Sequence, residues 1–272
     1  MKKLLSTIGK TLLFFVGWAL LGSLLPVPES PNQAVWRFWA ELIPFLTIVS
    51  FTILFWLFEK RKIELHIFSS PLKNILTGLF LGIIWIGIAA IVLMLLGTMK
   101  IVACNSVPML WLWVVSVFLN ATMQELLVRG YLYQMLKSNY SIVLATIITT
   151  ALFTLMHGGA FEAGILPVLN VLTMSLLMTL ALEYTQSLMV PILMHFVWNC
   201  VGAIILGGVT LADDYPHLCV TEFTGSTFLS GGTPKMEGSI VVLILNIALI
   251  LAFLLLLKRR KVVKSDPPNS NE

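Results

Sequence analysis

The sequence is poor in charge. Asp, Glu, Lys and Arg make up 11% of the 272 residues, whereas 58% are hydrophobic and the mean hydropathy is +0.95. A soluble domain carries about 25% charged residues, so this chain has too few to cover a surface that faces water. The shortage excludes an ordinary water-soluble enzyme and a disordered chain, and it favours a membrane protein with several spanning segments.

Cysteine is also scarce. Cys104, Cys200 and Cys219 form no paired framework and no C-x-x-C motif. Their spacing therefore indicates neither a disulfide scaffold nor a cysteine-based zinc site, and it does not reveal the redox compartment.

Long apolar runs are abundant. Because about 20 apolar residues in a helix cross the bilayer core, we predict an all-α, polytopic transmembrane bundle of about eight spans. The fourth run is too long for a simple span, so we expect its end to leave the membrane or to follow its surface. The predicted spans cover residues 11–26, 40–58, 75–97, 108–136, 141–157, 165–183, 187–207 and 239–257.

The basic residues predict the orientation of the chain. With the N-terminus in the cytoplasm, thirteen of the seventeen Lys and Arg residues fall in inner segments, as the positive-inside rule requires. Both termini are then predicted to be cytoplasmic. The pI near 9.0 reflects this topology and contact with an anionic lipid bilayer, and we expect no nucleic-acid partner.

Ionisable residues inside spans cost several kcal/mol, so each one marks a candidate functional position. A few polar residues stand out in the fourth, fifth and seventh spans. They are Gln124, Glu125, Arg129, His157, His195 and Asn199.

Spacing relates these residues to one another. Glu125 and Arg129 are four residues apart on one helical face and would neutralise each other, which taken alone is a structural arrangement. Gln124 is one helical step away and can face a different neighbour. His195 and Asn199 are also four apart and can point into one cavity. A single intramembrane histidine commonly bonds a neighbouring helix, but two histidines and a carboxylate on three helices favour a site.

Three motifs occur in order along the chain. Residues 124–130 (Q-E-L-L-V-R-G) are similar to E-E-x-x-x-R, Phe153 and His157 match F-x-x-x-H, and His195 and Asn199 match H-x-x-x-N. At these residues the chain resembles the CPBP family of intramembrane proteases, also called the Abi or CAAX-protease family. The family includes type II CAAX prenyl endopeptidases and bacterial proteins linked to bacteriocin immunity.

The resemblance extends beyond the motifs and implies a domain organisation. The segment from Gly231 to Gly238 is similar to a G-G…P-E-G stretch of many bacterial members. We expect N-terminal transmembrane helices, a catalytic core like that of the family, an outer loop with the last helix, and a disordered tail. These units are predicted to cover residues 1–107, 108–207, 208–264 and 265–272.

One departure from the family bears on function. By resemblance, the first glutamate of E-E-x-x-x-R is the general base that activates water, and the two histidines and the asparagine complete the catalytic centre. Here that position is Gln124, whose carboxamide cannot take up a proton. If the role belongs strictly to position 124, the chain is a weak enzyme, an inactive homologue or a disabled variant. If Glu125 is the base, its pairing with Arg129 must loosen.

The residues themselves also suggest a chemistry. Peptide hydrolysis needs an activated water, a base and donors for the oxyanion. His157 and His195 could bind the water, protonate the leaving amine or hold a metal, and Asn199 could donate to the oxyanion. Two histidines with Glu125 are also a possible ligand set for a divalent metal such as zinc. Because no H-E-x-x-H motif occurs, a metal-free glutamate–histidine site is an equal alternative.

The favoured hypothesis is an intramembrane endopeptidase of a bacterial cytoplasmic membrane. It would hydrolyse a membrane-associated peptide or protein, which in the CAAX branch is C-terminally lipidated. The first alternative is a catalytically silent homologue that acts as a bacteriocin-immunity or peptide-binding protein. The second is a transporter or channel, although no relay of charges continues through other spans.

Overall fold

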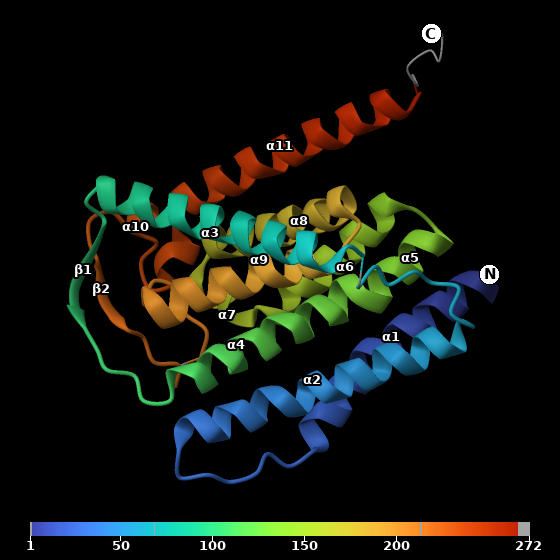
Figure 1. The fold of residues 1–272 in the computed structure, drawn as a ribbon, viewed down its shortest axis with the longest axis horizontal. Coiled ribbons are helices and arrows are strands. Elements are labelled where there is room, and N and C mark those ends of the chain that lie inside the picture. Colours follow the sequence, from blue (N-terminus) through green and yellow to red (C-terminus); the bar gives the residue numbers. More distant parts are fainter. Residues whose placement is uncertain (1, 68, 213, 266–272) are drawn as a thin grey trace.

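The computed structural model describes residues 2–67, 69–212 and 214–265, with side chains as far as residue 260. Figure 1 shows a bundle of long helices that run roughly side by side. The helices are α1 (Lys2–Leu24), α2 (Gln33–Phe58), α3 (Pro71–Leu95), α4 (Leu110–Glu125), α5 (Tyr133–Asn139), α6 (Ile142–Met156), α7 (Gly158–Ala163), α8 (Ile165–Thr185), α9 (Met189–Asn199), α10 (Thr227–Ser230) and α11 (Ile240–Ser265). Two π-helical segments, η1 (Leu126–Leu132) and η2 (Cys200–Ile205), and a 3₁₀ turn, η3 (Lys235–Gly238), complete the helical elements of the described residues.

The predicted all-α polytopic class is confirmed. In the described part of the chain, six helices are long and apolar enough to cross a membrane: Lys2–Leu24, Gln33–Phe58, Pro71–Leu95, Leu110–Asn139, Ile165–Thr185 and Ile240–Arg260. Two shorter apolar helices, Ile142–Met156 and Met189–Ile205, lie at the predicted fifth and seventh spans. The start of α1 and the end of α11 lie at the same end of the bundle (Figure 1). The count of eight spans and the cytoplasmic side of the termini stay predictions.

Local signals set several helix starts. The side chain of Asn32 accepts hydrogen bonds from the N–H groups of Ala34 and Val35 at the start of α2. Ser141 caps α6 by accepting from the N–H of Leu144, and Pro71 occupies the first position of α3. These are favourable residues for an N-cap and for a first helical position.

Two glycines bring α3 against α9, the helix that carries His195 and Asn199. A Cβ atom on Gly78 would lie 2.8 Å from Cβ of Leu193, and one on Gly82 would lie 2.7 Å from Cβ of Val197. Neither position has room for a side chain. Small residues at this spacing let two membrane helices approach closely, so α3 fixes the position of α9.

The helices that carry the first and third motifs both change geometry at these motifs, within the first and directly after the third. The π-helical segment η1 begins at Leu126, after Glu125, and contains Gly130 with a non-helical backbone (φ −71°, ψ −107°). The second, η2, begins at Cys200, after Asn199. Such π segments are frequent at functional sites because they re-aim the neighbouring side chains.

An antiparallel ribbon that the sequence did not predict lies at the end of the bundle away from the start of α1 (Figure 1). It consists of β1 (Met99–Cys104) and β2 (Cys219–Phe223). The predicted disordered tail lies outside the described residues except for Ser265, which ends α11.

Candidate active site

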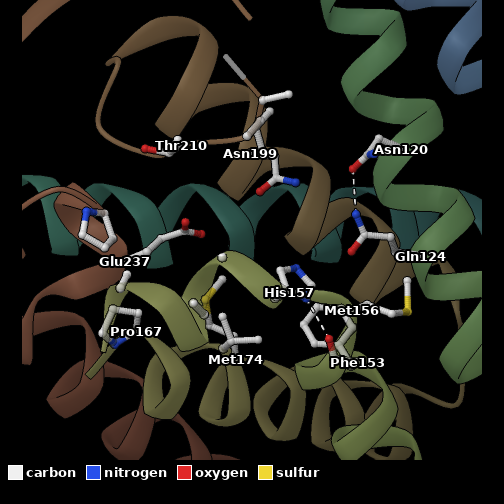
Figure 2. A pocket seen from close by; sticks show the side chains of 18 of the residues that line it. Asn120, Gln124, Phe153, Met156, His157, Pro167, Met174, Asn199, Thr210 and Glu237 are labelled. Carbon is white, nitrogen blue, oxygen red and sulfur yellow. Dashed lines mark hydrogen bonds between the residues drawn. The ribbon is translucent and has the colours of Figure 1, made fainter. Parts of the chain in front are cut away.

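A cavity of about 580 Å³ lies between α4, α6, α7, α8 and α9, and the segments on either side of β2 cover it (Figure 2). Gln124, His157, His195 and Asn199 all line it. The structure therefore brings together four of the six residues selected from the sequence, although they come from three separate parts of the chain.

Glu125 and Arg129 lie outside the cavity lining, in a cluster that we call the closed ion pair. Nη1 of Arg129 donates to both oxygens of Glu125, at 2.9 and 2.8 Å. Its Nη2 donates to the carbonyl and the hydroxyl of Ser175, each at 2.7 Å, and its Nε donates to Thr179 at 3.2 Å. Both charged side chains are almost completely buried. The pair is satisfied by its own hydrogen bonds, as a buried ion pair must be.

His195 connects the closed ion pair to the cavity. Its Nδ1 lies 2.9 Å from Oε1 of Glu125. Because an ionised carboxylate only accepts hydrogen bonds, Nδ1 carries the proton and Nε2 is the unprotonated nitrogen of the neutral ring. Glu125 thus fixes the tautomer and the orientation of His195.

His157 is fixed in a similar way by the backbone. Its Nδ1 lies 2.7 Å from the carbonyl oxygen of Phe153, the other residue of the second motif. A carbonyl oxygen cannot donate, so Nδ1 is the donor and Nε2 of the neutral ring keeps a free lone pair. Figure 2 shows the ring in the cavity, with the amide of Gln124 pointing towards it.

The orientation of the Gln124 amide follows from a carboxylate on another helix. Oε2 of Glu41, in α2, accepts from Nδ2 of Asn120 at 2.9 Å. Oδ1 of Asn120 then accepts from Nε2 of Gln124 at 2.8 Å. Because Glu41 can only accept, it sets the orientation of both amides in turn. Oε1 of Gln124 is thereby turned towards the cavity, where it is buried and has no partner among the described residues.

Glu41 was not selected from the sequence, although it is an ionisable residue in the predicted span 40–58. Its side chain is buried. The rule for ionisable residues inside spans applies to it and would have found it. Its other oxygen accepts from Arg37 at 3.3 Å and from the hydroxyl of Tyr215 at 3.1 Å. Arg37 is also paired with Asp214, so charged side chains surround the N-terminal part of α2.

Sequence reasoning also missed Glu237 as a site residue. Among the described residues that line the cavity, it carries the only carboxylate. Figure 2 shows this carboxylate extending into the cavity on the side of Asn199. Nε1 of Trp198 donates to Oε1 at 3.3 Å, and Nδ2 of Asn170 holds the backbone carbonyl of Glu237 at 2.8 Å. The available signal was the G-G…P-E-G likeness.

Desolvation raises the pKa of Glu237 to about 7, and the hydrogen bond from Trp198 partly opposes this shift. A carboxyl group with such a pKa can carry or release a proton near neutral pH. Perturbed carboxyl groups in cavities are candidates for acid–base chemistry.

Asn199 lies one helical turn after His195, as predicted from the spacing. Its side chain lines the cavity, and no hydrogen bond among the described residues involves it. The amide is therefore free to bind a group inside the cavity.

The described residues contain no group of three His, Cys, Asp or Glu side chains that could hold a metal ion. Glu125, His157 and His195, the ligand set considered from the sequence, do not meet around one point. The oxygens of Glu125 already accept from Arg129 and His195. The residues as arranged do not fit a metal, and we derive no step through one.

The described helices form an all-α bundle that is apolar and long enough for a membrane, and residues of three ordered motifs lie around one cavity. Residues 106–201 match the family described as type II CAAX prenyl endopeptidase Rce1-like, which confirms the resemblance found in the three motifs. The family implies a protease that acts on a membrane-associated peptide or protein. A comparison with curated proteins and one with solved structures found no match.

Proposed function

We propose that this protein is an intramembrane endopeptidase in which His157 takes the proton from the attacking water. The observation that supports this assignment is that Nε2 of His157 and Oε1 of Gln124 are both acceptors in the cavity and have no partner among the described residues. A water molecule between them would donate one hydrogen to each. Gln124 positions the water, which a carboxamide can do, and histidine performs the proton transfer, which a carboxamide cannot do.

The remaining groups complete a hydrolysis. The water oxygen attacks the peptide carbonyl carbon while His157 accepts the proton, and the amide of Asn199 donates to the oxyanion that forms. His195 is held against Glu125 with its proton on Nδ1, so its unprotonated Nε2 can accept a hydrogen bond from the substrate. The proton on His157 then passes to the leaving nitrogen as the C–N bond breaks. Glu237, on the Asn199 side of the cavity, provides a second group for this proton transfer.

The cavity also bears on the substrate. Its volume of about 580 Å³ is within the range for ligand sites, and methionines form part of its wall. Met123, Met156 and Met174 line it, and such flexible apolar side chains suit varied apolar groups. We propose a peptide segment of a membrane-associated protein in a bacterial cytoplasmic membrane as the substrate, with a lipidated C-terminus as one form of it.

The test is cleavage of a peptide panel by the purified protein in nanodiscs. His157→Ala should lower the rate about 10²- to 10⁴-fold, the usual contribution of a general base. His66→Asn is the matched control, because His66 lies in a loop and asparagine tolerates its positive φ of 52°. We expect it to cleave as the wild type does. Equal cleavage by the wild type and His157→Ala would overturn the assignment.

Gln124 favours one competing function, that of a silent homologue that binds a peptide without cutting it. Under that hypothesis neither the wild type nor Gln124→Glu cleaves any peptide, and both proteins still confer protection on the cell. Cleavage by the wild type that depends on His157 excludes this alternative.

A further inference from the structure

Two cysteines that are far apart in the sequence face each other in the ribbon. Cys104 is the last residue of β1, Cys219 is the first residue of β2, and they are direct partners in the antiparallel pairing. Cys104 is exposed and Cys219 is partly exposed, whereas the third cysteine, Cys200, is buried in η2.

A β-bulge creates this alignment. Met99 to Ile101 pair with Phe223 to Thr221, but the register shifts between Ile101 and Ala103, and Cys104 then pairs with Cys219. In an unbroken register Val102 would pair with Val220, and Cys104 would face Leu218 instead of Cys219. Bulges are built features of a ribbon that re-aim side chains, and this one brings two thiols together.

The backbone geometry suits a disulfide. The N–H of Asn105 donates to the carbonyl of Leu218 at 2.6 Å, which places the two cysteines at the neighbouring position without mutual backbone hydrogen bonds. Residues opposite each other at such a position have Cα atoms about 4.5 Å apart, within the range of about 4.4–6.8 Å that a disulfide needs. The pKa of the Cys219 thiol is raised by desolvation and by the adjacent Cys104 thiol, so the two side chains interact.

The ribbon lies at the end of the bundle opposite to the start of α1 and the end of α11 (Figure 1). The distribution of Lys and Arg predicts that those helix ends are cytoplasmic. The ribbon then faces the outside, which is the side on which disulfides form and persist.

We propose that Cys104 and Cys219 form a disulfide bond by exchange with an external disulfide oxidant. The Cys104 thiolate attacks one sulfur of the oxidant, forming a mixed disulfide and releasing one oxidant thiol. The Cys219 thiolate then attacks the Cys104 sulfur and releases the second oxidant thiol. Two protons and two electrons pass from the cysteine pair to the oxidant.

The bond would restrain the chain segment between η2 and β2, which covers the cavity. The chain between η2 and β2 contributes Thr210, Leu211 and Tyr215 to the cavity lining, and Cys219 ends that stretch. A bond to Cys104 ties it to the connection between α3 and α4. The disulfide therefore fastens the outer cover to the helix that carries Gln124, and its existence does not depend on the proposed protease activity.

Thiol counting tests the proposal. Cells are lysed directly into denaturant that contains a small alkylating reagent, which blocks every free thiol, including the buried Cys200. The purified protein is then reduced and labelled with a polymer-linked maleimide. We expect two new labels on the wild type, none on Cys104→Ser or Cys219→Ser, and two on the control Cys200→Ser. Absence of new labels on the wild type, or a pair that includes Cys200, overturns the proposal.

A second measurement covers the case in which a variant folds poorly. The Tm of the wild type should fall on reduction, whereas the Tm of the Cys104→Ser/Cys219→Ser double variant should not change. Equal Tm values for oxidised and reduced wild type would show that no such bond constrains the fold.

Discussion

The closed ion pair and the cavity are two polar regions that lie on opposite sides of His195, and they differ in how completely their hydrogen bonds are made. In the closed ion pair, Arg129 donates to four partner groups and Glu125 accepts from two side chains. In the cavity, Oε1 of Gln124 is buried without a partner among the described residues. Within the described part of the chain, Nε2 of His157 and the amide of Asn199 also lack a partner.

This difference divides the polar side chains of the first motif into two kinds. Glu125 and Arg129 have a structural role, whereas Gln124 faces the cavity and is available for function. Gln124 and Glu125 are adjacent in the chain, so they project about 100° apart around α4 and face different regions. A buried polar group without a partner costs about 1–3 kcal/mol. Such groups gathered in one cavity therefore indicate a place for a ligand, while the saturated pair behind them holds the helices together.

The largest effect is expected from breaking the closed ion pair. Arg129→Ala leaves the buried carboxylate of Glu125 without its main partner, and we expect a loss of about 3–5 kcal/mol of stability. Thermal unfolding in detergent measures this loss as a lower Tm. The matched control is Glu125→Leu/Arg129→Met, which removes both charges and should recover much of the stability without restoring cleavage. Wild-type stability of Arg129→Ala would show that the pair is not structural.

The opposite behaviour is expected in the cavity. Asn199→Ala removes an oxyanion donor and should lower kcat about 10²- to 10³-fold, with little change in Tm because the amide has no partner to lose. Asn246→Ala is the matched control. That buried asparagine accepts from Trp85 and donates to Thr173, so its loss should lower Tm and spare catalysis. If both variants lower Tm equally, Asn199 is a structural residue.

Hydropathy predicted the helical bundle well because the length and apolarity of a span are local properties. The predicted span 165–183 corresponds to α8 and the predicted span 75–97 to α3. The predicted first span begins at residue 11, because Lys10 interrupts the apolar run, whereas the helix that contains it extends further towards the N-terminus. The helix begins at Lys2, since long basic side chains can extend along a helix to reach water.

The candidate site was only partly predictable. Helical spacing correctly separated Gln124 from the face of Glu125, and it placed His195 and Asn199 in one cavity. The orientation of Gln124 depends on Glu41, whose contact with Asn120 joins two helices and leaves no mark in either sequence segment. The pairing of the two ribbon cysteines depends on one bulge, and strand register across a long separation has no local signal.

The effect of Asn120→Ala on cleavage tests whether Asn120 orients the residue at position 124, because this effect should change direction when that residue is changed. In the wild type, Asn120→Ala frees the Gln124 amide to rotate and should lower cleavage about tenfold, equivalent to one hydrogen bond. In the Gln124→Glu background, Oδ1 of Asn120 would face a carboxylate, so the same substitution should raise cleavage. Cleavage assays of the four proteins measure this coupling. The same direction of change in both backgrounds would contradict the orienting role.

A pH dependence distinguishes the carboxylate of the cavity from one on the surface. The pKa of Glu237 is raised from 4.5 to about 7, so its contribution to stability is fully present below pH 4.5 and is lost as the pH rises through 7. Glu237→Gln is neutral at every pH, and its Tm should rise relative to that of the wild type between pH 5 and 8.

His157, His195 and Tyr215 also line the cavity, but they are present in both proteins and cancel in the difference. Glu222→Gln is the matched control, because Glu222 is exposed in β2 and lies outside the cavity lining. Parallel Tm curves for the wild type and Glu237→Gln would mean that Glu237 titrates as a solvated carboxylate and is not part of the site.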